Sequence, residues 1–456
     1  MSDEVSAASR QCLRECTGCG LFQAIPPLRP GTVAECLRCG ELLRRRRRDS
    51  LDVTLALNLA GLVLFGIAIV FPLFGMNLRG LHRDTSIPLL PLRFEQQGLW
   101  QLGLVVLGTI LVAPVLRLAL TVGAILGLRL RWRADVLAAC VRWRVWLAPW
   151  AMTEVFLLGA FVAYTRLAAI ATVQVGLGVY ALGALMLLTV MSDAWLDEQA
   201  LWEAIGRRRM PSHIARAGAT RIGCDACGVV SRQIEGSRCS RCDAVLHRRK
   251  PNSLARTWAL LTAAVLCYVP ANLYPVMTVV LLGRGHPSTI LGGVQELIES
   301  RMWPLALLVF IASVLVPLLK LAGLSYMLIT TQRGSQARLL DRTRLYRLVD
   351  FVGRWSMIDV FMVSILVALV QMGVLAQVTP GFGGVFFAAV VILTMSASFS
   401  FDPRLMWDAA GVSASGVPGS GVGGPDDKAV ASVRQVPGTE AGAVQPGARV
   451  LPVKTR

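Results

Sequence analysis

Eight nearly continuous runs of apolar residues, each of the length that crosses a lipid bilayer, dominate the sequence. A helix needs about 20 apolar residues to span the hydrocarbon layer, and a helix of a soluble core would show a polar face over that length. Hydrophobic residues make up 54% of the 456 residues and charged residues 16%, which excludes a single soluble core. We therefore expect an all-α polytopic membrane protein with eight transmembrane helices. The runs cover residues 53–75, 99–128, 145–165, 167–192, 257–283, 303–330, 355–379 and 381–401.

The positive charge of the chain, a formal +18, gathers between alternate apolar runs. Its clusters lie within residues 44–48, 129–144, 207–209, 248–250 and 333–347, all on one side of the predicted membrane. Basic residues in short loops mark the cytoplasmic side, so both termini are expected there. These clusters are orientation signals with some contact to anionic lipids, and a nucleic-acid partner is not expected.

The two halves of the sequence resemble each other, which indicates an internal duplication. The stretch "WAMTEVF" at residues 150–156 matches "WSMIDVF" at 355–361, and "LTVMS" at 188–192 resembles "LTMSA" at 393–397. An even number of predicted spans separates the copies, so they should be parallel repeats of four helices. A tryptophan, a proline and a basic residue share one spacing in both copies: Trp100, Pro114 and Arg117, then Trp303, Pro317 and Lys320.

Eight of the eleven cysteines form four Cys-x-x-Cys pairs, with two pairs ahead of each set of four runs. Two thiolates at this spacing grip one metal ion, and a glycine after three of the pairs permits the tight turn, so two pairs complete a four-cysteine zinc ribbon. The alternative is thiol redox chemistry, but a redox pair needs one Cys-x-x-Cys beside a βαβ pattern, for which neither segment has room. We expect two structural zinc ions, bound by Cys16, Cys19, Cys36, Cys39, Cys224, Cys227, Cys239 and Cys242.

These patterns divide the chain into five parts. A first zinc ribbon is predicted over residues 1–48 and a first four-helix membrane domain over 49–200. A linker with the second zinc ribbon follows over 201–250, both ribbons being cytoplasmic, and a second four-helix membrane domain covers 251–408. The tail, residues 409–456, is rich in small residues and proline without an apolar period, so we expect it to be disordered.

Lys320 is the only charged residue in the apolar run 303–330. A lysine near the centre of a membrane span raises the free energy of insertion by about 2.5 to 3.5 kcal/mol on insertion scales. We therefore expect Lys320 to have an interaction partner or a functional role. Depth along the predicted helices brings it level with Asp359, Ser356 and Thr394. We therefore expect a polar intramembrane cluster that contains a Lys320–Asp359 ion pair.

Pro317 adds a second feature to this cluster. Its ring cannot donate to the carbonyl of Ser313, so the helix should kink just above the lysine. The cluster is either interhelical glue or a site that handles protons or lipid headgroups, and the sequence leaves both open. The first half repeats the layout with Arg117, Glu154 and Thr189.

The sequence has no P-loop and no other soluble catalytic constellation, and its four histidines show no ligand spacing. We therefore do not expect an enzyme. Any energy for work across the membrane would come from a gradient or from a partner.

Taken together, these motifs resemble the paraquat-inducible protein A family. The resemblance rests on the duplicated four-cysteine segments ahead of four spans, on "WSMIDVF" and on the ending "SFDPRLMWD" at residues 400–408. It covers nearly everything from Cys16 to Trp407. The first half departs from it, since "SDAWLD" at 192–197 stands where the second half has "SFDPR".

The resemblance implies an integral inner-membrane protein of a Gram-negative envelope that transports lipid between membranes. It would pass phospholipid to or from a periplasm-spanning tunnel protein of the mammalian-cell-entry (MCE) type, with membrane units similar to tetraspanins. The family's polar site falls on Lys320, Ser356, Asp359 and Thr394. Two alternatives stay open: a thiol-redox or electron-transfer membrane protein, and an anchor for the tunnel protein that transports nothing itself.

Overall fold

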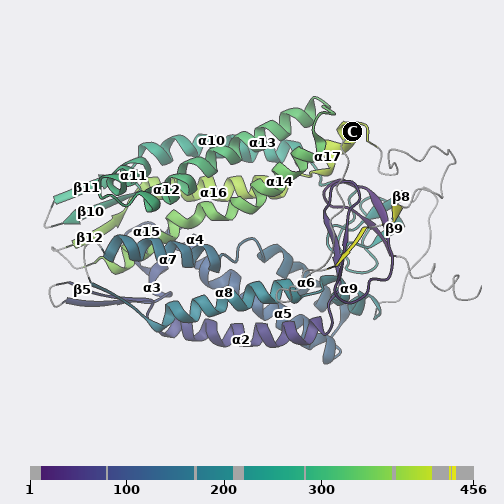
Figure 1. The fold of residues 1–456 in the computed structure, drawn as a ribbon, viewed down its shortest axis with the longest axis horizontal. Coiled ribbons are helices and arrows are strands. Elements are labelled where there is room, and N and C mark those ends of the chain that lie inside the picture. The colour runs from purple at the N-terminus through teal and green to yellow at the C-terminus, as the bar shows by residue number, and fades with distance from the viewer. Residues whose placement is uncertain are drawn as a thin grey trace, which may run out of the picture.

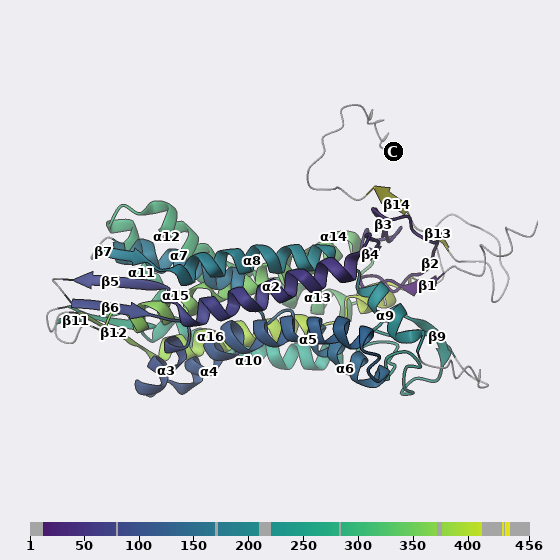
Figure 2. The ribbon, with the colours of Figure 1, turned by 90° about the horizontal axis from the view of Figure 1, so that it is seen from below.

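A computed structural model of the chain describes residues 12–78, 81–168, 172–208, 220–281, 284–371, 376–412, 431–432 and 434–437. The helices form an elongated bundle (Figure 1). Two cysteine-containing modules lie at one end, which we name the module end, and small β-sheets lie at the other, the sheet end (Figures 1 and 2).

The first membrane half, residues 50–206, is built around α2 (Ser50–Val70), which packs against α8 (Leu177–Trp195) and α5 (Ala113–Arg129). Pro72 follows α2 and has no backbone N–H with which to continue a helix. The other elements are β5 (Phe74–Leu78), β6 (Leu81–Thr85), α3 (Leu89–Gln96), α4 (Trp100–Val106), η1 (Leu107–Val112), α6 (Ala134–Leu147), α7 (Thr153–Ala168), β7 (Thr172–Val175) and α9 (Glu198–Gly206).

The second membrane half, residues 253–409, repeats this order of elements. Here α10 (Ser253–Leu273) packs against α16 (Phe382–Ser400), as α2 does against α8. Pro275 follows α10 as Pro72 follows α2. The other elements are β10 (Met277–Leu281), β11 (Arg284–Ser288), α11 (Ile290–Glu299), α12 (Trp303–Phe310), η2 (Ile311–Leu315), α13 (Val316–Gln332), α14 (Leu339–Gly353), η3 (Arg354–Met357), α15 (Ile358–Leu369), β12 (Ala376–Pro380) and α17 (Arg404–Ala409).

Seven helical runs among the described residues are long and apolar enough to cross a membrane. The run predicted at residues 145–165 corresponds to α7, which has 16 residues and is not one of the seven. The run predicted at 355–379 starts earlier, because α14 continues through a turn of 3-10 helix into α15 as one run, Leu339–Leu369. The predicted domain boundaries at residues 200 and 408 fall inside α9 and α17.

The all-α expectation misses a three-stranded antiparallel sheet at the sheet end of each half. Strand β5 pairs with β6 and β7, and β10 pairs with β11 and β12. The predicted spans 53–75 and 257–283 ran into β5 and β10, because apolarity alone does not separate a helix from a buried strand. Prolines 72 and 275 end the helices first, and Thr278, Val279 and Val280 are β-branched residues that favour a strand.

The two modules are built from short hairpins. Residues 431–432 and 434–437 of the tail, expected to be disordered, form strands that pair with the first module, because β2 and β3 offer open edges. The rest of the tail beyond residue 412 lies outside the described residues. The strands are β1 (Cys12–Glu15), β2 (Phe22–Ile25), β3 (Thr32–Glu35) and β4 (Leu42–Arg45) in the first module, β8 (Thr220–Gly223) and β9 (Val230–Gln233) in the second, and β13 (Ala431–Ser432) and β14 (Arg434–Pro437) in the tail.

Each module docks on the membrane half that it does not precede in the chain. Cys16 of the first module shares a hydrophobic cluster with Leu324 and Trp407 of the second half. Cys227 of the second module shares one with Trp202 of the first half. The chain therefore crosses itself at the module end, and each module is held against the other half.

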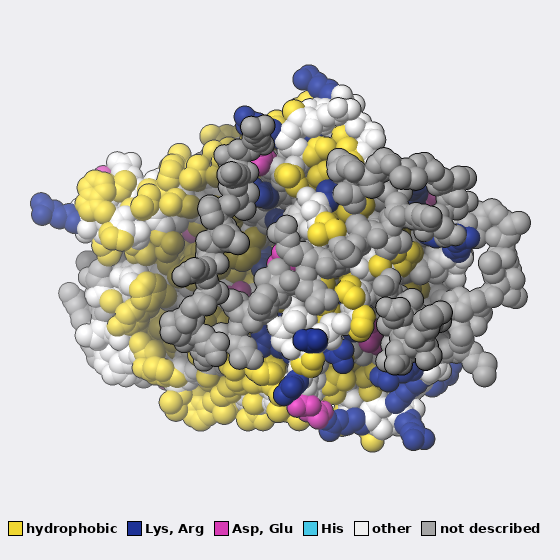
Figure 3. Space-filling view, turned by 45° about the vertical axis from the view of Figure 1, so that its right-hand side comes forward, with side chains coloured by type: hydrophobic (Ala, Val, Ile, Leu, Met, Phe, Trp, Pro, Cys, Tyr) yellow, Lys and Arg dark blue, Asp and Glu magenta, His cyan; other side chains and the backbone are white. Residues whose placement is uncertain are grey.

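The side of the bundle is apolar. Val63, Leu266 and Leu307 have exposed fractions of 65%, 69% and 60%. Hydrophobic side chains cover the bundle in Figure 3, and Lys and Arg side chains gather around the module end, which is turned toward the viewer. A helical surface of this extent is stable in lipid and would aggregate in water.

Candidate metal centres and intramembrane polar site

The eight cysteines predicted as metal ligands come together in two buried clusters of four sulfur atoms. Four sulfurs around one zinc ion at about 2.3 Å lie about 3.8 Å apart, at the corners of a tetrahedron. The described cysteines form no disulfide. Both clusters therefore fit one tetrahedral metal ion each. Sulfur–sulfur distances across the clusters are 3.5 to 3.7 Å, for Cys16–Cys39, Cys19–Cys36, Cys224–Cys242 and Cys227–Cys239.

A tight backbone turn positions each Cys-x-x-Cys pair. Gly20 has a φ of 73°, and its N–H donates to the carbonyl of Cys16 at 2.9 Å. Asp243 takes the place of glycine in the fourth pair with a φ of 63°, a conformation that aspartate tolerates better than most residues. Outside the thiolates, Gln23 Nε2 lies 2.8 Å from the sulfur of Cys36, a contact of the kind that orients a metal ligand.

Lys320 lies in the core of the second half, 2% exposed, where α13, α14 and α16 meet. Its Nζ donates to Thr394 Oγ1 at 2.8 Å and to the Gly353 carbonyl at 3.4 Å. Ser356 Oγ donates to the same carbonyl at 2.9 Å. A Cβ at residue 353 would lie 3.3 Å from Nζ, so glycine permits the close approach. Three predicted residues are thus brought together around a carbonyl that sequence reasoning did not single out.

The expected ion pair between Lys320 and Asp359 is absent. The expectation started the helix near residue 355, whereas Asp359 follows α14 and η3 and lies nearer the sheet end. It lines a cavity of about 30 Å³ with Arg166 and Thr289, and its Oδ1 is buried without a hydrogen-bond partner. The charge of Arg166, on α7 of the first half, acts on Asp359 across the boundary between the halves. Arg166 was not predicted as a site residue. The sequence did contain a signal for it, because it is a single charged residue between the apolar runs 145–165 and 167–192.

Arg117, the counterpart of Lys320, has a different environment. Its NH2 group donates to both carboxylate oxygens of Asp193 at 2.5 Å. Glu154 and Thr189 line the same small cavity as this pair, and Thr189 Oγ1 donates to the carbonyl of Met186 at 2.8 Å. The first half thus gathers its three predicted residues but neutralises its cation with an acid that sequence reasoning missed. The available signal was its position one helical turn after the threonine.

Both long helices contain a π-helical segment just before the proline that was expected to kink them. Segment η1 precedes Pro114, and η2 precedes Pro317. A wider turn accommodates a proline that cannot donate to the preceding turn, and such segments are frequent at functional sites. Ser313 lies in η2 beside Asp359, and its Oγ donates to the Val309 carbonyl at 2.7 Å.

A buried ionic network joins both modules to the second half at the "SFDPRLMWD" stretch. Arg404 is 3% exposed, and its guanidinium lies 2.8 Å from Asp402. It also lies 3.3 Å from Glu15 of the first module and 3.0 Å from Asp225 of the second. Arg249 adds a contact of 2.8 Å to Glu15. No contact of this stretch was predicted from the sequence. The available signal was the Asp402–Arg404 pair, which has no counterpart in the first half.

Burial and charge act differently on the two acids of this network. Burial raises the pKa of Glu15, although the charges of Arg404 and Arg249 oppose the change. Burial would also raise the pKa of Asp402, but the hydrogen bonds and charge of Arg404 outweigh it and hold that pKa below its usual range. The stability that Asp402 contributes is therefore present above its unfolded-state pKa and is lost as the pH falls through its folded-state value.

The fold and these sites define a multi-pass membrane protein with two four-cysteine modules and a duplicated membrane domain. The chain belongs to the paraquat-inducible protein A family, whose model matches residues 51–206 and 254–411, once in each half. The two matches agree with the internal duplication expected from the sequence.

Curated relatives cover most of the chain. A protein named Intermembrane transport protein PqiA, from Escherichia coli, is 33% identical over 399 residues, which are 86% of this chain and 95% of that protein. Lipophilic envelope-spanning tunnel protein A, also from Escherichia coli, is 31% identical over 408 residues, 87% of this chain and 91% of that protein. A probable intermembrane transport protein of Haemophilus influenzae is 28% identical over 408 residues, 86% of this chain and 95% of that protein. No solved structure matches the chain.

Proposed function

We propose that this protein is the inner-membrane component of an intermembrane lipid-transport system, which passes phospholipid to or from a periplasm-spanning tunnel protein of the MCE type. The names of the relatives, which refer to intermembrane transport and to an envelope-spanning tunnel, support this proposal. In this arrangement α7 is the eighth span, the module end faces the cytoplasm and the sheet end faces the periplasm. The arginine-rich module end supports that orientation.

The observation that carries the proposal is the environment of Lys320. An amine held in an apolar bundle as glue would be expected to face a carboxylate, as Arg117 faces Asp193 in the first half. Lys320 instead bonds to a hydroxyl and a carbonyl. Among the described residues no acid lies within ion-pair distance of Lys320, although the charge of Asp350, on α14, acts on it from farther away. An amine without an acid in direct contact can respond to a charge that arrives, either a proton or the phosphate of a lipid headgroup.

A growth assay under envelope stress tests this role. Lys320→Ala should abolish complementation while the protein accumulates and keeps its partner. Arg117→Ala is the matched control and should retain growth, since Asp193 has 46% of its side chain exposed and can stay hydrated. Degradation of Lys320→Ala would favour structural glue instead. Accumulation with full growth would show that the lysine has no role in transport.

The metal in the four-cysteine modules is proposed to be zinc, because four thiolates in a closed tetrahedral cluster suit a structural zinc site. Such an ion would be held by the eight cysteines and would stabilise the fold of each module without an open position for chemistry. Elemental analysis of the purified chain should find about two zinc ions per chain. Iron with a visible absorption band would favour the redox alternative.

The partner is proposed to contact the sheet end. A photo-crosslinker at Arg83, exposed on β6, should capture the tunnel protein in cells. The matched control is Arg232, exposed on β9 of the second module, which should capture nothing across the membrane. Capture at Arg232 with none at Arg83 would contradict the proposed orientation.

A further inference from the structure

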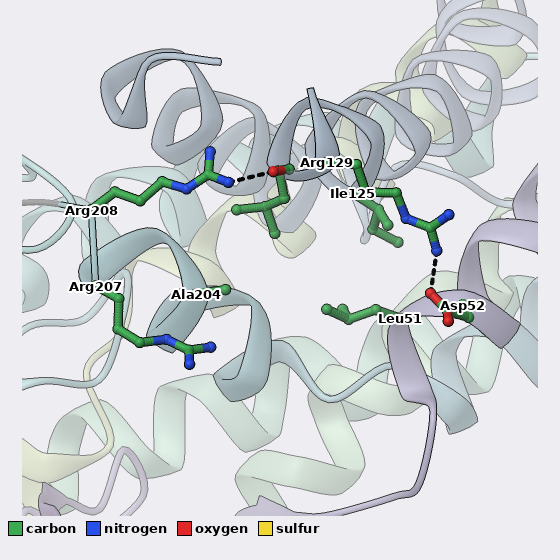
Figure 4. A pocket seen from close by; sticks show the side chains of 8 residues that line it. Leu51, Asp52, Ile125, Arg129, Ala204, Arg207 and Arg208 are labelled. Carbon is green, nitrogen blue, oxygen red and sulfur yellow. Dashed lines mark hydrogen bonds and ion pairs between the residues drawn. The ribbon is translucent and has the colours of Figure 1, made fainter. Parts of the chain in front are cut away.

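A pocket of about 350 Å³ opens at the module end of the first half, between the start of α2 and the ends of α5 and α9 (Figure 4). Four apolar side chains form its wall, and four charged side chains complete the lining. The apolar residues are Leu51, Ile125, Leu128 and Ala204, and the charged residues are Asp52, Arg129, Arg207 and Arg208.

The charges around this pocket do not cancel, since three arginines face one carboxylate. Arg129 forms an ion pair with Asp52. Arg208 donates to the carbonyls of Leu128 and Trp132, and it forms no ion pair with any residue that the structure describes. The side chain of Arg207 is exposed and has no hydrogen bond or ion pair within the part of the chain that the structure describes. Figure 4 shows Arg207 and Arg208 on one side of the pocket and Arg129 on the other.

The pocket lies where the spans meet the surface of the bilayer. Helix α2 begins at Ser50 and α5 ends at Arg129, and both belong to runs that can cross a membrane. Next to the arginines, Leu126 and Leu130 have exposed fractions of 41% and 60%, and Trp132 has 45%. Exposed leucines favour contact with acyl chains, and tryptophan prefers the level of the lipid headgroups. The mouth of the pocket therefore lies at the boundary between the acyl-chain region and the headgroup region.

The second half does not repeat these charges. Gln332 ends α13 as Arg129 ends α5, and Ala255 is the third residue of α10 as Asp52 is of α2. Val412 follows Asp402 by the same spacing as Arg207 follows Asp197. The same elements thus form without these arginines, so the fold does not require them.

We propose that this pocket binds the phosphate group of an anionic phospholipid from the leaflet at the module end. Arginine suits phosphate because its planar group donates two hydrogen bonds at once, and basic pockets between spans bind anionic headgroups. The glycerol part lies against the apolar wall, and the acyl chains continue along the exposed leucines. This site is separate from Lys320 and does not depend on the proposed transport.

Native mass spectrometry of the full chain in detergent tests the site, with titrations of phosphatidylglycerol, phosphatidylethanolamine and glycerol 3-phosphate. The variant Arg129→Gln with Arg207→Gln should bind phosphatidylglycerol about tenfold more weakly than the natural chain. The matched control, Arg256→Gln, removes an exposed arginine at the same end of α10 and should change the affinity by less than about twofold. Arg207→Lys keeps the charge but loses the planar pair of donors, so its affinity for phosphatidylglycerol should lie between those of the natural chain and Arg207→Gln.

Several outcomes would overturn the proposal. One is an affinity for phosphatidylglycerol that is unchanged in the double variant, and another is a loss of affinity in Arg256→Gln as large as that in the double variant. The third is that the natural chain binds phosphatidylethanolamine as tightly as phosphatidylglycerol. Displacement of the lipid by an equal concentration of glycerol 3-phosphate would assign the pocket to a soluble phosphate ester instead. The melting temperature of each variant reports folding, and if the double variant is unfolded, Arg207→Gln alone is judged by the same criteria.

Discussion

The two membrane halves share one order of elements, but their matching basic residues, Arg117 and Lys320, differ in exposure and in the groups that they contact. Arg117 forms an ion pair with Asp193 at 2.5 Å, and these side chains are 18% and 46% exposed. Lys320 is 2% exposed and bonds to Thr394 and to a backbone carbonyl. The first half has a partly hydrated ion pair, while the amine of the second half bonds to neutral groups in its core, and the acid that acts on it, Asp350, is beyond ion-pair distance.

One position explains much of this difference. Asp193 comes one turn after Thr189, and Ser398 comes at the same spacing after Thr394. The buried Ser398 hydroxyl has no hydrogen-bond partner. A duplication that preserves the threonine and the basic residue can therefore change the electrostatics of the site through a single neighbour.

Making the second half resemble the first at its module end should have the largest effect on stability. Gln199 stands two residues after Asp197, as Arg404 stands two residues after Asp402. Arg404→Gln leaves the buried Asp402 without its ion-pair partner and Glu15 with Arg249 alone. It should cost about 3 kcal/mol or more, since breaking a buried network strands a charge. Thermal denaturation in detergent and limited proteolysis of the modules measure the loss.

The matched control for that change is Arg248→Gln, which removes the same charge from an exposed position near Arg249. We expect it to alter stability by less than about 0.5 kcal/mol. Equal stability of the Arg404 and Arg248 variants would show that the network does not hold the modules to the bundle.

The threonines give a direct comparison of the two sites. Thr394→Val removes the hydroxyl that Lys320 bonds, so the second half should lose about 1–3 kcal/mol of unfolding free energy. Thr189 Oγ1 bonds only within its own helix among the described residues, so Thr189→Val should cost less than about 0.5 kcal/mol. Unfolding in mixed micelles measures both, and similar losses would remove the proposed difference between the halves.

The smallest effect is expected from the first-half ion pair itself. Asp193→Asn keeps the shape of the side chain but removes its charge, and a pair that is partly exposed contributes about 0–1 kcal/mol. Added salt should reduce the contribution further. A loss of several kcal/mol in the same unfolding assay would mean that the first half depends on its charge as strongly as the second.

Sequence patterns predicted most of what local chemistry controls. Cysteine spacing placed all eight sulfurs of the two clusters, and apolar length located seven runs that can cross the membrane. The grouping of Lys320 with Ser356 and Thr394 followed from depth along adjacent helices, and the structure brings these residues together.

The failures share a physical cause, which is that helix ends and partners are set by contacts beyond a local window. Asp359 was misplaced because the charged segment before residue 355 folds as α14 and lengthens the helical run. The sheet-end strands were missed because Val279 and its neighbours are apolar in either a helix or a strand. No local sequence pattern indicates which module docks on which membrane half. The ionic network of Arg404, which joins both modules to the second half, could therefore not be predicted from one sequence.

The exchange of modules between the halves has a consequence for how the chain is made. The first module leaves the ribosome early, but the surface on which it docks is made much later, since Leu324 follows Cys16 by roughly 300 residues and Trp407 by roughly 390. At about 5–20 residues per second, the module waits roughly 20–80 s before the whole surface exists. During synthesis it must hold its shape without that surface, and a metal ion bound by its four cysteines would allow this. Starving cells of metal should therefore harm newly made chains far more than finished ones.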